Sequence, residues 1–355
     1  MERELAHMSN QKTRPERAAS IRFAVIGAGG MGAVHAASIA TFADAAVTWV
    51  ADVDDARSSR LATQVGARAT TSMEEAVGAG DVDAVVIALP TSLHRLATEL
   101  AAAHGKHVFC EKPVARTPDD AQAMIDACTR AGVRLMIGHV VRFFDEYATI
   151  KRLLDAGTIG QPGMVRASRL NAPVMARSAW FADLERNGGI VCDLMIHELD
   201  TLRWYFGAVE RVFAHGLTYT PYQPTRDYAM ASLRFRNGAT ALVETSWAHT
   251  GFRTAIELSG QYGIIRHASD TAATLTVERT AAEGGIPAVV RQRPLGESPY
   301  QRELRHFIDR VRTDTPFLTS GDEGKAAVAL ACAILESMRT GRPTHPEPVV
   351  TPVHR

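Results

Sequence analysis

Short apolar runs recur along the first part of the chain, and amphipathic segments separate them. An apolar run of roughly four to eight residues between turn residues is typical of a buried parallel strand. The predicted strands are Ile21–Ile26, Ala46–Ala51, Asp83–Ala88, Lys106–Cys110 and Val133–Ile137, and the predicted helices between them are Gly30–Thr41, Asp55–Gln64, Leu93–Ala103 and Pro118–Ala131. This alternation predicts βαβ units with right-handed crossovers and a parallel sheet.

Near Gly138 the pattern changes to strand-like runs separated by turn residues. One pair of runs flanks Asn237-Gly238, and Asn-Gly between two apolar runs is a strong hairpin signal. The predicted strands are Gly163–Leu170, Val209–Thr218, Tyr228–Phe235, Ala239–Ala248, Thr254–Leu258, Ile264–His267 and Ala273–Glu278, and the predicted helices are Asp145–Ala156, Val191–Phe206, Pro299–Arg312 and Gly321–Met338. The second half is therefore predicted to be α+β with a largely antiparallel sheet.

The length of the chain and this change of pattern predict two domains. At 355 residues the chain is too long for one ordinary hydrophobic core. We expect a disordered polar tail at 1–20, a first domain at 21–140, a second domain at 141–343 and a C-terminal extension at 344–355.

The composition excludes several classes of partner. Lysine plus arginine and aspartate plus glutamate both number 39, so there is no electrostatic reason to expect nucleic acid or an anionic membrane surface as a partner. No apolar run reaches the roughly 18 residues that a membrane span needs. Four cysteines without a C-x-x-C spacing predict reduced thiols of a cytoplasmic protein, at Cys110, Cys128, Cys192 and Cys332.

A glycine-rich turn follows the first predicted strand and opens a helix, with the spacing Gly27-x-Gly29-x-x-Gly32. Gly27 allows a tight turn, Gly29 lets the backbone approach a pyrophosphate, and Gly32 lets helix and strand pack closely. The start of the helix, at Gly30 and Met31, offers free N–H groups to phosphates. The alternative is a glycine-rich turn without a ligand, as in any α/β protein. The strand–turn–helix context favours dinucleotide binding.

Asp52 lies at the end of the second predicted strand, where a carboxylate accepts hydrogen bonds from the adenosine ribose. A carboxylate there would repel a 2′-phosphate, and no arginine follows it directly. Arg57 and Arg60 are expected on the solvent face of the next helix. NAD is therefore predicted in preference to NADP.

Glu111-Lys112-Pro113 follows a predicted parallel strand, at the sheet edge where open α/β sheets bind ligands. Proline biases Lys112 toward an extended backbone. A lysine here can donate a hydrogen bond or act as an acid whose ionisation its surroundings adjust. The alternative is an ordinary surface lysine in a loop.

Asp193 and His197 are four residues apart and share one face of a predicted helix whose other positions are mostly apolar. Histidine is the side chain best suited to exchanging a proton near neutral pH. The alternative is a buried, hydrogen-bonded pair that only packs the helix. No metal site is predicted, because no further ligands converge at a recognisable spacing.

Together these motifs resemble the Gfo/Idh/MocA oxidoreductase family over Ile21 to Pro343. The segments that carry the resemblance are VIGAGGMG at Val25–Gly32, LPTSLH at Leu89–His94, CEKP at Cys110–Pro113, GHVVRF at Gly138–Phe143 and GGIVCDLMIHELD at Gly188–Asp200. The last of them is most similar to inositol dehydrogenases and related cyclitol or sugar dehydrogenases. Two positions depart from the common pattern, because Ser92 and His139 stand where many members carry asparagine.

The resemblance implies an N-terminal Rossmann domain and a C-terminal domain whose open antiparallel sheet forms the interface of a homodimer or homotetramer. It implies a catalytic set of Lys112, Asp193 and His197, in which His197 takes the hydroxyl proton, Lys112 positions that oxygen, and Asp193 orients the substrate or His197. It also implies that the nicotinamide half of the cofactor is bordered by Pro90, Ser92, His94, Glu111 and Lys112.

The function expected from these features is NAD-dependent oxidation of a secondary alcohol in a cyclitol or sugar-like polyol. Candidate pocket residues are Arg142, Asn171, Trp180 and Tyr228. Three alternatives stay open: a non-catalytic regulator that binds the dinucleotide, a glycosidase that uses NAD transiently, and an imine or tetrapyrrole reductase. Both Lys112 and His197 are present, which favours the dehydrogenase over the regulator.

Overall fold

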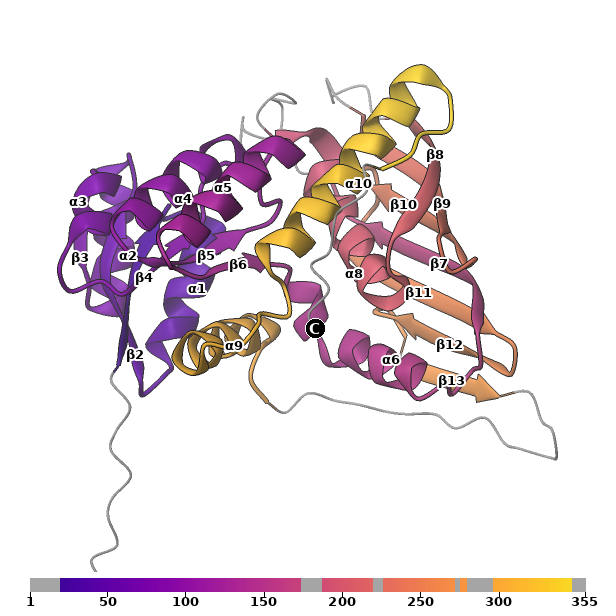
Figure 1. The fold of residues 1–355 in the computed structure, drawn as a ribbon, viewed down its shortest axis with the longest axis horizontal. Helices are drawn as coiled ribbons and strands as arrows, with labels where there is room; N and C mark the ends of the chain where they lie inside the picture. Colours follow the sequence, from indigo (N-terminus) through magenta and orange to yellow (C-terminus); the bar gives the residue numbers. More distant parts are fainter. Residues whose placement is uncertain (1–19, 174–186, 220–225, 272–274, 280–295, 347–355) are drawn as a thin grey trace, which may run out of the picture.

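The computed structural model describes residues 20–173, 187–219, 226–271, 275–279 and 296–346, and these contain two sheets that lie side by side (Figure 1). The first sheet, at left in Figure 1, carries helices on both faces. The second sheet, at right, carries helices only on the face turned toward the first. The predicted fold class, an α/β Rossmann-type part followed by a part with a largely antiparallel sheet, is confirmed.

The first sheet has six strands in the order β3-β2-β1-β4-β5-β6, and every neighbouring pair is parallel. Its elements are β1 (Ile21–Ile26), α1 (Gly30–Ala40), β2 (Ala45–Ala51), α2 (Asp55–Val65), β3 (Arg68–Thr70), α3 (Met73–Gly78), β4 (Ala84–Ile87), α4 (His94–Ala103), β5 (His107–Glu111), α5 (Pro118–Arg130) and β6 (Leu135–Gly138). The strand order reverses between β1 and β4, and ligands of open α/β sheets bind beside the carboxyl ends of strands at such a point.

Two of these elements were not predicted, β3 and α3. β3 has three residues, of which Arg68 and Ala69 are exposed, so it contains no apolar run. α3 has only six residues, which is too short for a helical period to show. The other strands and helices of the first sheet lie within a few residues of their predicted positions.

The second sheet has seven strands in the order β13-β12-β11-β7-β10-β9-β8. They are β7 (Pro162–Leu170), β8 (Val209–Leu217), β9 (Tyr228–Phe235), β10 (Thr240–Ser246), β11 (Arg253–Gly260), β12 (Gly263–Ala268) and β13 (Leu275–Arg279). The predicted hairpin is confirmed, because β9 and β10 pair antiparallel around Gly238, whose φ is 93°. The β7–β10 pair is parallel, and the other neighbouring pairs are antiparallel.

The two faces of the second sheet differ in what covers them. Val165 and Ala167 of β7 are buried against α6 (Asp145–Asp155) and α8 (Ile196–Phe206), which lie on the inner face (Figure 1). The opposite face exposes large apolar side chains from four neighbouring strands: Met164, Phe213, Met230 and Leu242. We call these four residues the exposed sheet patch.

Two helices late in the chain pack against the first sheet or its helices, and the second of them also contacts the second sheet. α9 (Pro299–Thr313) packs onto the first sheet, because Leu304 and Phe307 are buried in one cluster with Phe23 and Phe109. α10 (Gly321–Thr340) runs between the two sheets, packed on both α5 and β8 (Figure 1). No helix in the described part of the chain is both long and apolar enough to cross a membrane.

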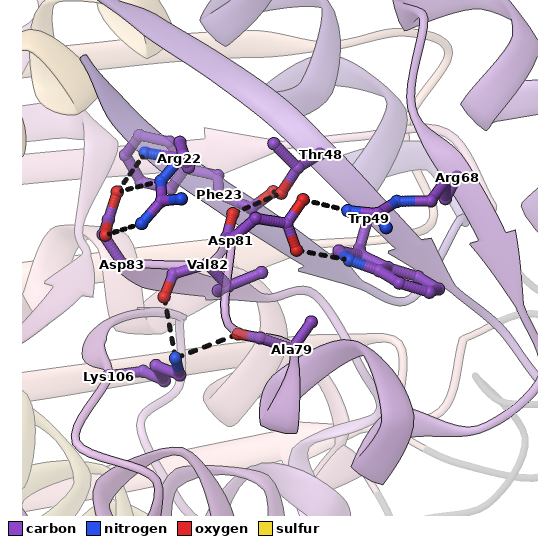
Figure 2. A network of polar contacts seen from close by, with 10 residues as sticks. All are labelled: Arg22, Phe23, Thr48, Trp49, Arg68, Ala79, Asp81, Val82, Asp83 and Lys106. Carbon is purple, nitrogen blue, oxygen red and sulfur yellow. Dashed lines mark hydrogen bonds and ion pairs between the residues drawn. The ribbon is translucent and has the colours of Figure 1, made fainter.

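A polar network closes the amino-terminal edge of the first sheet (Figure 2). Arg22 donates to both carboxylate oxygens of Asp83, at 2.9 and 2.7 Å. Lys106, which precedes β5, donates to the carbonyls of Ala79 and Val82 at 3.1 and 2.7 Å (Figure 2). These polar groups bind one another, and the glycine-rich turn and Lys112 lie at the opposite, carboxyl-terminal edge of the sheet.

Candidate active site

The glycine-rich turn after β1 is tightly packed at Gly27 and Gly32 and open at Gly29 and Gly30. Gly27 has a φ of 99°, and a Cβ there would lie 2.4 Å from the Ala88 carbonyl oxygen. A Cβ at Gly32 would lie 1.8 Å from the Gly27 carbonyl oxygen, so only glycine lets α1 pack this closely. Gly29 and Gly30 have no atom within 4 Å of an added Cβ, so here the backbone faces open space.

The start of α1 has no side-chain cap, in contrast to α2, α3 and α5 of the first sheet. Gly29 is its N-cap residue and provides no side chain, whereas Asp54 caps α2 and Thr117 caps α5. Its first N–H groups, with Met31 in the first turn, are therefore free donors beside the open part of the loop. Such a helix start suits a pyrophosphate, so the residues present fit the predicted dinucleotide.

Asp52 lies at the end of β2 and contacts this loop directly. Its Oδ2 accepts a hydrogen bond from the Ala28 N–H at 2.8 Å, and its Oδ1 accepts one from the Asp54 N–H at 2.9 Å. The carboxylate is thereby held at the rim of the phosphate loop. Arg57 lies on the exposed surface, as the sequence predicted, and there it pairs with Asp54 at 3.1 Å rather than with Asp52.

The loops after β4 and β5 contain the residues predicted to border the nicotinamide. Pro90 and Ser92 are exposed in the turn that follows β4. His94 is buried, and its Nδ1 and Nε2 lie 3.0 and 2.8 Å from the carbonyl oxygens of Pro113 and Leu89. His94 therefore ties the two loops together from beneath, and its ring nitrogens are not available to a ligand.

Lys112 and Asp193 meet at the carboxyl-terminal edge of the sheet. The Lys112 Nζ donates to the Asp193 backbone carbonyl at 2.7 Å and to its Oδ1 at 3.2 Å. The two side chains keep 16% and 27% of their surface exposed, so a small molecule can reach them. The first sheet thus provides the lysine, and the segment before α8 provides its partner.

The helix that carries Asp193 and His197 is not a regular α-helix. Val191–Met195 forms a π-helical turn, and α8 begins at Ile196. The sequence predicted one continuous α-helix with both side chains on one face. The wider turn instead places the Asp193 carboxylate on Lys112, and π-turns inside helices are frequent at functional sites.

The His197 imidazole is half-buried at the start of α8, and its Nδ1 lies in the interior without a hydrogen-bond partner among the described residues. Burial lowers the pKa of His197 well below its usual value, and the positive charges of Lys112 and Arg169 act in the same direction. Asp193 is not among the charges that shift it. His197 is therefore neutral at neutral pH and able to accept a proton.

A buried cluster of three groups supports the lysine loop, and sequence reasoning did not find it. The Glu111 carboxylate turns into the core, where it lies 2.6 Å from His35 Nε2 and accepts the Lys112 N–H at 3.1 Å. Glu303 of α9 lies beside them, and one imidazole nitrogen and one oxygen from each carboxyl group lie within 4.8 Å of one another. No local pattern in the chain announces this meeting of α1, β5 and α9.

The two carboxyl groups of this cluster ionise differently. Burial raises the pKa of Glu303 well above its usual value, and the negative charge of Glu111 adds to that effect. Burial would also raise the pKa of Glu111, but the hydrogen bond with His35 and the charge of Lys112 bring it below its usual value. The cluster therefore contains one carboxylate, Glu111, and one neutral carboxylic acid, Glu303.

Two of the candidate pocket residues, Asn171 and Tyr228, lie beside Ser246 of β10, whereas Arg142 is buried in a cluster of ion pairs. Arg142 does not line a pocket, because it is buried in ion pairs with Asp200 and Glu323, each at 2.6 Å. Asn171 follows β7, where its N–H donates to the Ser246 carbonyl at 2.7 Å. Tyr228 donates from its hydroxyl to Glu244 at 3.2 Å. Trp180 lies outside the described residues.

These features define an oxidoreductase that uses a nicotinamide dinucleotide. They are a parallel sheet whose strand order reverses, an uncapped phosphate loop with Asp52 at its rim, and a lysine and a neutral histidine on neighbouring elements. Residues 21–139 match the model of the oxidoreductase family with an NAD-binding Rossmann fold, and residues 147–266 match the GFO/IDH/MocA C-terminal domain. The chain belongs to the Gfo/Idh/MocA family.

Individual relatives agree with this assignment. The chain is 31% identical over 340 residues to the myo-inositol 2-dehydrogenase of Thermotoga maritima, which covers 93% of this chain and 100% of the relative. It is 29% identical over 337 residues to the inositol 2-dehydrogenase of Rhizobium meliloti, covering 91% and 98%. A solved oxidoreductase from Agrobacterium radiobacter in complex with NAD+, L-tartaric acid and magnesium superposes with a TM-score of 0.83, at 27% identity, covering 92% and 98%. The chain is an NAD-dependent dehydrogenase that acts on CH–OH groups.

Proposed function

We propose that the chain oxidises a secondary hydroxyl group of a cyclitol or sugar-like polyol of the inositol type, with NAD as the hydride acceptor. Two relatives that match almost the whole chain are inositol 2-dehydrogenases, which supports a substrate of this class. The observation that carries the proposal is the Lys112–Asp193 pair, with His197 four residues further along the same helical segment, at the edge of the sheet where the phosphate loop also lies.

Each member of the set has a separate task in this proposal. His197 accepts the proton of the substrate hydroxyl, for which it must be neutral. Lys112 donates a hydrogen bond to the same oxygen and so fixes its position. Asp193 holds the lysine through its carboxylate and its backbone carbonyl, which supports a role in orienting Lys112 rather than His197.

The proposed cofactor-binding residues divide into two groups. Direct contact is proposed for the phosphate loop, the ribose carboxylate and the exposed loop residues: Gly27, Gly29, Gly30, Met31, Gly32, Asp52, Pro90, Ser92 and Lys112. His94 and Glu111 turn their polar atoms into the protein, so we propose that they shape the nicotinamide side of the site by holding the loops.

We further propose that residues 21–140 bind the cofactor and that residues 141–343 hold the substrate and associate with a second copy. The exposed sheet patch supports a homodimer or homotetramer, because four large apolar side chains on one sheet face are left uncovered. The cytoplasm is the proposed compartment, since the four cysteines are free thiols.

A screen for NADH formation against a panel of polyols and sugars, including the inositol isomers, tests the proposal. We expect one class of cyclitol or sugar-like polyol to be oxidised by the wild-type protein and not by Lys112→Met. NAD binding without any turnover on the panel would favour the regulatory alternative. NAD-dependent release of an aglycone from a glycoside would favour the glycosidase.

A further inference from the structure

His139 is a buried imidazole that the proposed chemistry does not use. It follows β6, the neighbour of the lysine-bearing strand β5, and only 1% of its surface is exposed. Neither of its ring nitrogens has a hydrogen-bond partner within the described ranges. Buried polar groups in proteins are nearly always hydrogen-bonded, so two free nitrogens on one buried ring call for an explanation.

His197 also has a ring nitrogen without a hydrogen-bond partner among the described residues. Its Nδ1 is also buried and without a partner in the part of the chain that the structure describes. A neutral imidazole carries its proton on one nitrogen and a lone pair on the other. If His197 takes a proton from the substrate through Nε2, its Nδ1 must carry the hydrogen, and that hydrogen needs an acceptor inside the protein.

His139 approaches α8 at Asp200, on the helix that also carries His197. Asp200 is three residues beyond His197, so both side chains leave α8 on one side. The His139 Nδ1 lies 3.8 Å from the Asp200 Oδ2. Arg142 fixes this arrangement, because its Nε and Nη2 bind the two carboxylate oxygens of Asp200 at 2.8 and 2.6 Å.

The electrostatic surroundings of the two rings overlap. The positive charge of Lys112 lowers the pKa of both His139 and His197, so one cation lies near both rings. Burial lowers the pKa of His139, and the positive charges of Arg142 and Lys112 lower it further. The negative charges of Asp200 and Glu323 raise it, but by less than burial lowers it. His139 is therefore neutral, with one nitrogen able to donate and the other able to accept.

We propose that His139 is a positioning residue, which accepts the Nδ1–H of His197 on its Nε2 and donates its own Nδ1–H to Asp200. The series His197–His139–Asp200 then selects the tautomer of His197 in which Nε2 is free for the substrate proton. The separation of 3.8 Å to Asp200 is longer than a hydrogen bond, and the His139 Nε2 and the His197 Nδ1 do not form a hydrogen bond with each other in this structure. Such contacts are often long in unliganded enzymes and shorten in the complex.

This inference rests on the proposed role of His197 as the base, but its first test needs no substrate. Long-range proton–nitrogen NMR spectra of protein with ¹⁵N-labelled histidine distinguish the two tautomers of each ring. The chain has 13 histidines, and the spectrum of His197→Asn assigns the signal of His197. We expect the Nδ1–H tautomer at His197 in the wild type with NAD bound. The Nε2–H tautomer there would overturn the proposal.

Substitution of His139 provides the second test. His139→Phe keeps a flat ring but removes the acceptor, so we expect the His197 signal to move toward the Nε2–H tautomer. We expect kcat to fall by on the order of 10²-fold, with little change in the dissociation constant of NAD. His139→Gln offers a carbonyl acceptor and should restore the tautomer and much of kcat.

His306→Phe is the matched control, because it removes a partly buried imidazole of α9 that contacts Phe143 and Phe317 instead. An unchanged His197 tautomer in His139→Phe, or an equal loss of kcat in the Phe and Gln variants, would overturn the proposal. A tautomer that shifts as expected in a protein that oxidises no polyol would retain the role of His139 and reject the proposed substrate class.

Discussion

The Lys112 ammonium contacts Asp193 twice, through the backbone carbonyl at 2.7 Å and through the carboxylate at 3.2 Å. An ammonium group has three N–H donors and no acceptor, so these contacts use two and leave one. Because both side chains keep part of their surface exposed, the third donor can reach a small molecule. This arrangement holds the lysine in one place while it still offers a hydrogen bond to a substrate oxygen.

Replacing Lys112 by methionine should abolish most turnover and leave the fold and NAD binding intact. Loss of a positioned donor costs on the order of 10²–10⁴ in rate. Lys106→Met is a matched control, because Lys106 enters β5 from the opposite edge and binds only backbone carbonyls there (Figure 2). We expect Lys106→Met to lower stability with wild-type kcat. Equal kcat values for the two variants would remove Lys112 from the chemistry.

Asp193→Asn should be milder than Lys112→Met, because the backbone carbonyl of Asp193 still accepts from Lys112. The amide side chain keeps one oxygen that can also accept a hydrogen bond. We therefore expect a loss of kcat of about tenfold, smaller than the loss for a positioned acid–base group. Steady-state kinetics with NAD saturating measures the difference. A loss in Asp193→Asn as large as in Lys112→Met would mean that the carboxylate contacts the reacting groups itself.

Asp52→Ala should weaken NAD binding and narrow the preference over NADP. The substitution removes the proposed partner of the ribose and the acceptor that holds the Ala28 N–H at 2.8 Å. A hydrogen bond to a charged group contributes about 1.5–3 kcal/mol, or roughly 10- to 100-fold in affinity. Calorimetric titration with both dinucleotides measures this, with Asp54→Ala, the cap of α2, as the control. Tighter binding of NADP than NAD by the wild type would contradict the prediction.

The parallel sheet could be predicted from the sequence because its central strands contain uninterrupted apolar runs, as at Phe23–Ile26 and Ala84–Ile87. The three-residue strand Arg68–Thr70 could not, since it is mostly exposed and contributes almost nothing to the core. Elements that bury a continuous apolar surface leave a periodic signal. Short edge elements are held by their neighbours and leave none.

Some features of the site could likewise be predicted from the sequence, and others could not. Gly27, Asp52 and Lys112 occur at fixed offsets from predicted strands, so their meeting at one sheet edge follows from the βαβ pattern. The π-helical turn at Val191–Met195 changes where Asp193 points, and the apolar spacing of the segment is compatible with either helix type. The contact of Glu111 with Glu303 joins β5 to a helix near the end of the chain, and no local pattern encodes it.

Glu303→Gln should change how stability depends on pH. The pKa of Glu303 is raised well above 4.5 in the folded protein by burial and by the charge of Glu111. Above the ordinary pKa the folded state keeps this proton and the unfolded state loses it, so the contribution of Glu303 to stability decreases as pH rises. A glutamine holds no such proton. The variant should therefore gain stability relative to the wild type as the pH rises above the ordinary pKa of glutamate.

Urea unfolding at a series of pH values measures that difference. The slope approaches about 1.4 kcal/mol per pH unit where only the folded state is protonated. Glu336→Gln is the control, because Glu336 is exposed, pairs with Arg339 and is ionised in both states over this range. Parallel curves for Glu303→Gln and the wild type would show that Glu303 is ionised in the folded protein.

The pH profile of catalysis should follow His197. Burial, together with the positive charges of Lys112 and Arg169, places its pKa well below 6.5. Oxidation of an alcohol needs the neutral imidazole, so kcat/KM should rise with pH on the acid side of 6.5 and stay level through neutral pH. Reduction of the carbonyl needs the protonated imidazole, so its rate should fall as pH rises over the same range.

Two variants test this assignment. Lys112→Met removes one positive neighbour and so raises the pKa of His197, and the ascending limb of its residual activity should lie at higher pH than in the wild type. His197→Asn should lose the ascending limb, since asparagine does not titrate. If His197→Asn keeps the wild-type limb, the titrating base is another group, and Lys112 becomes the first candidate.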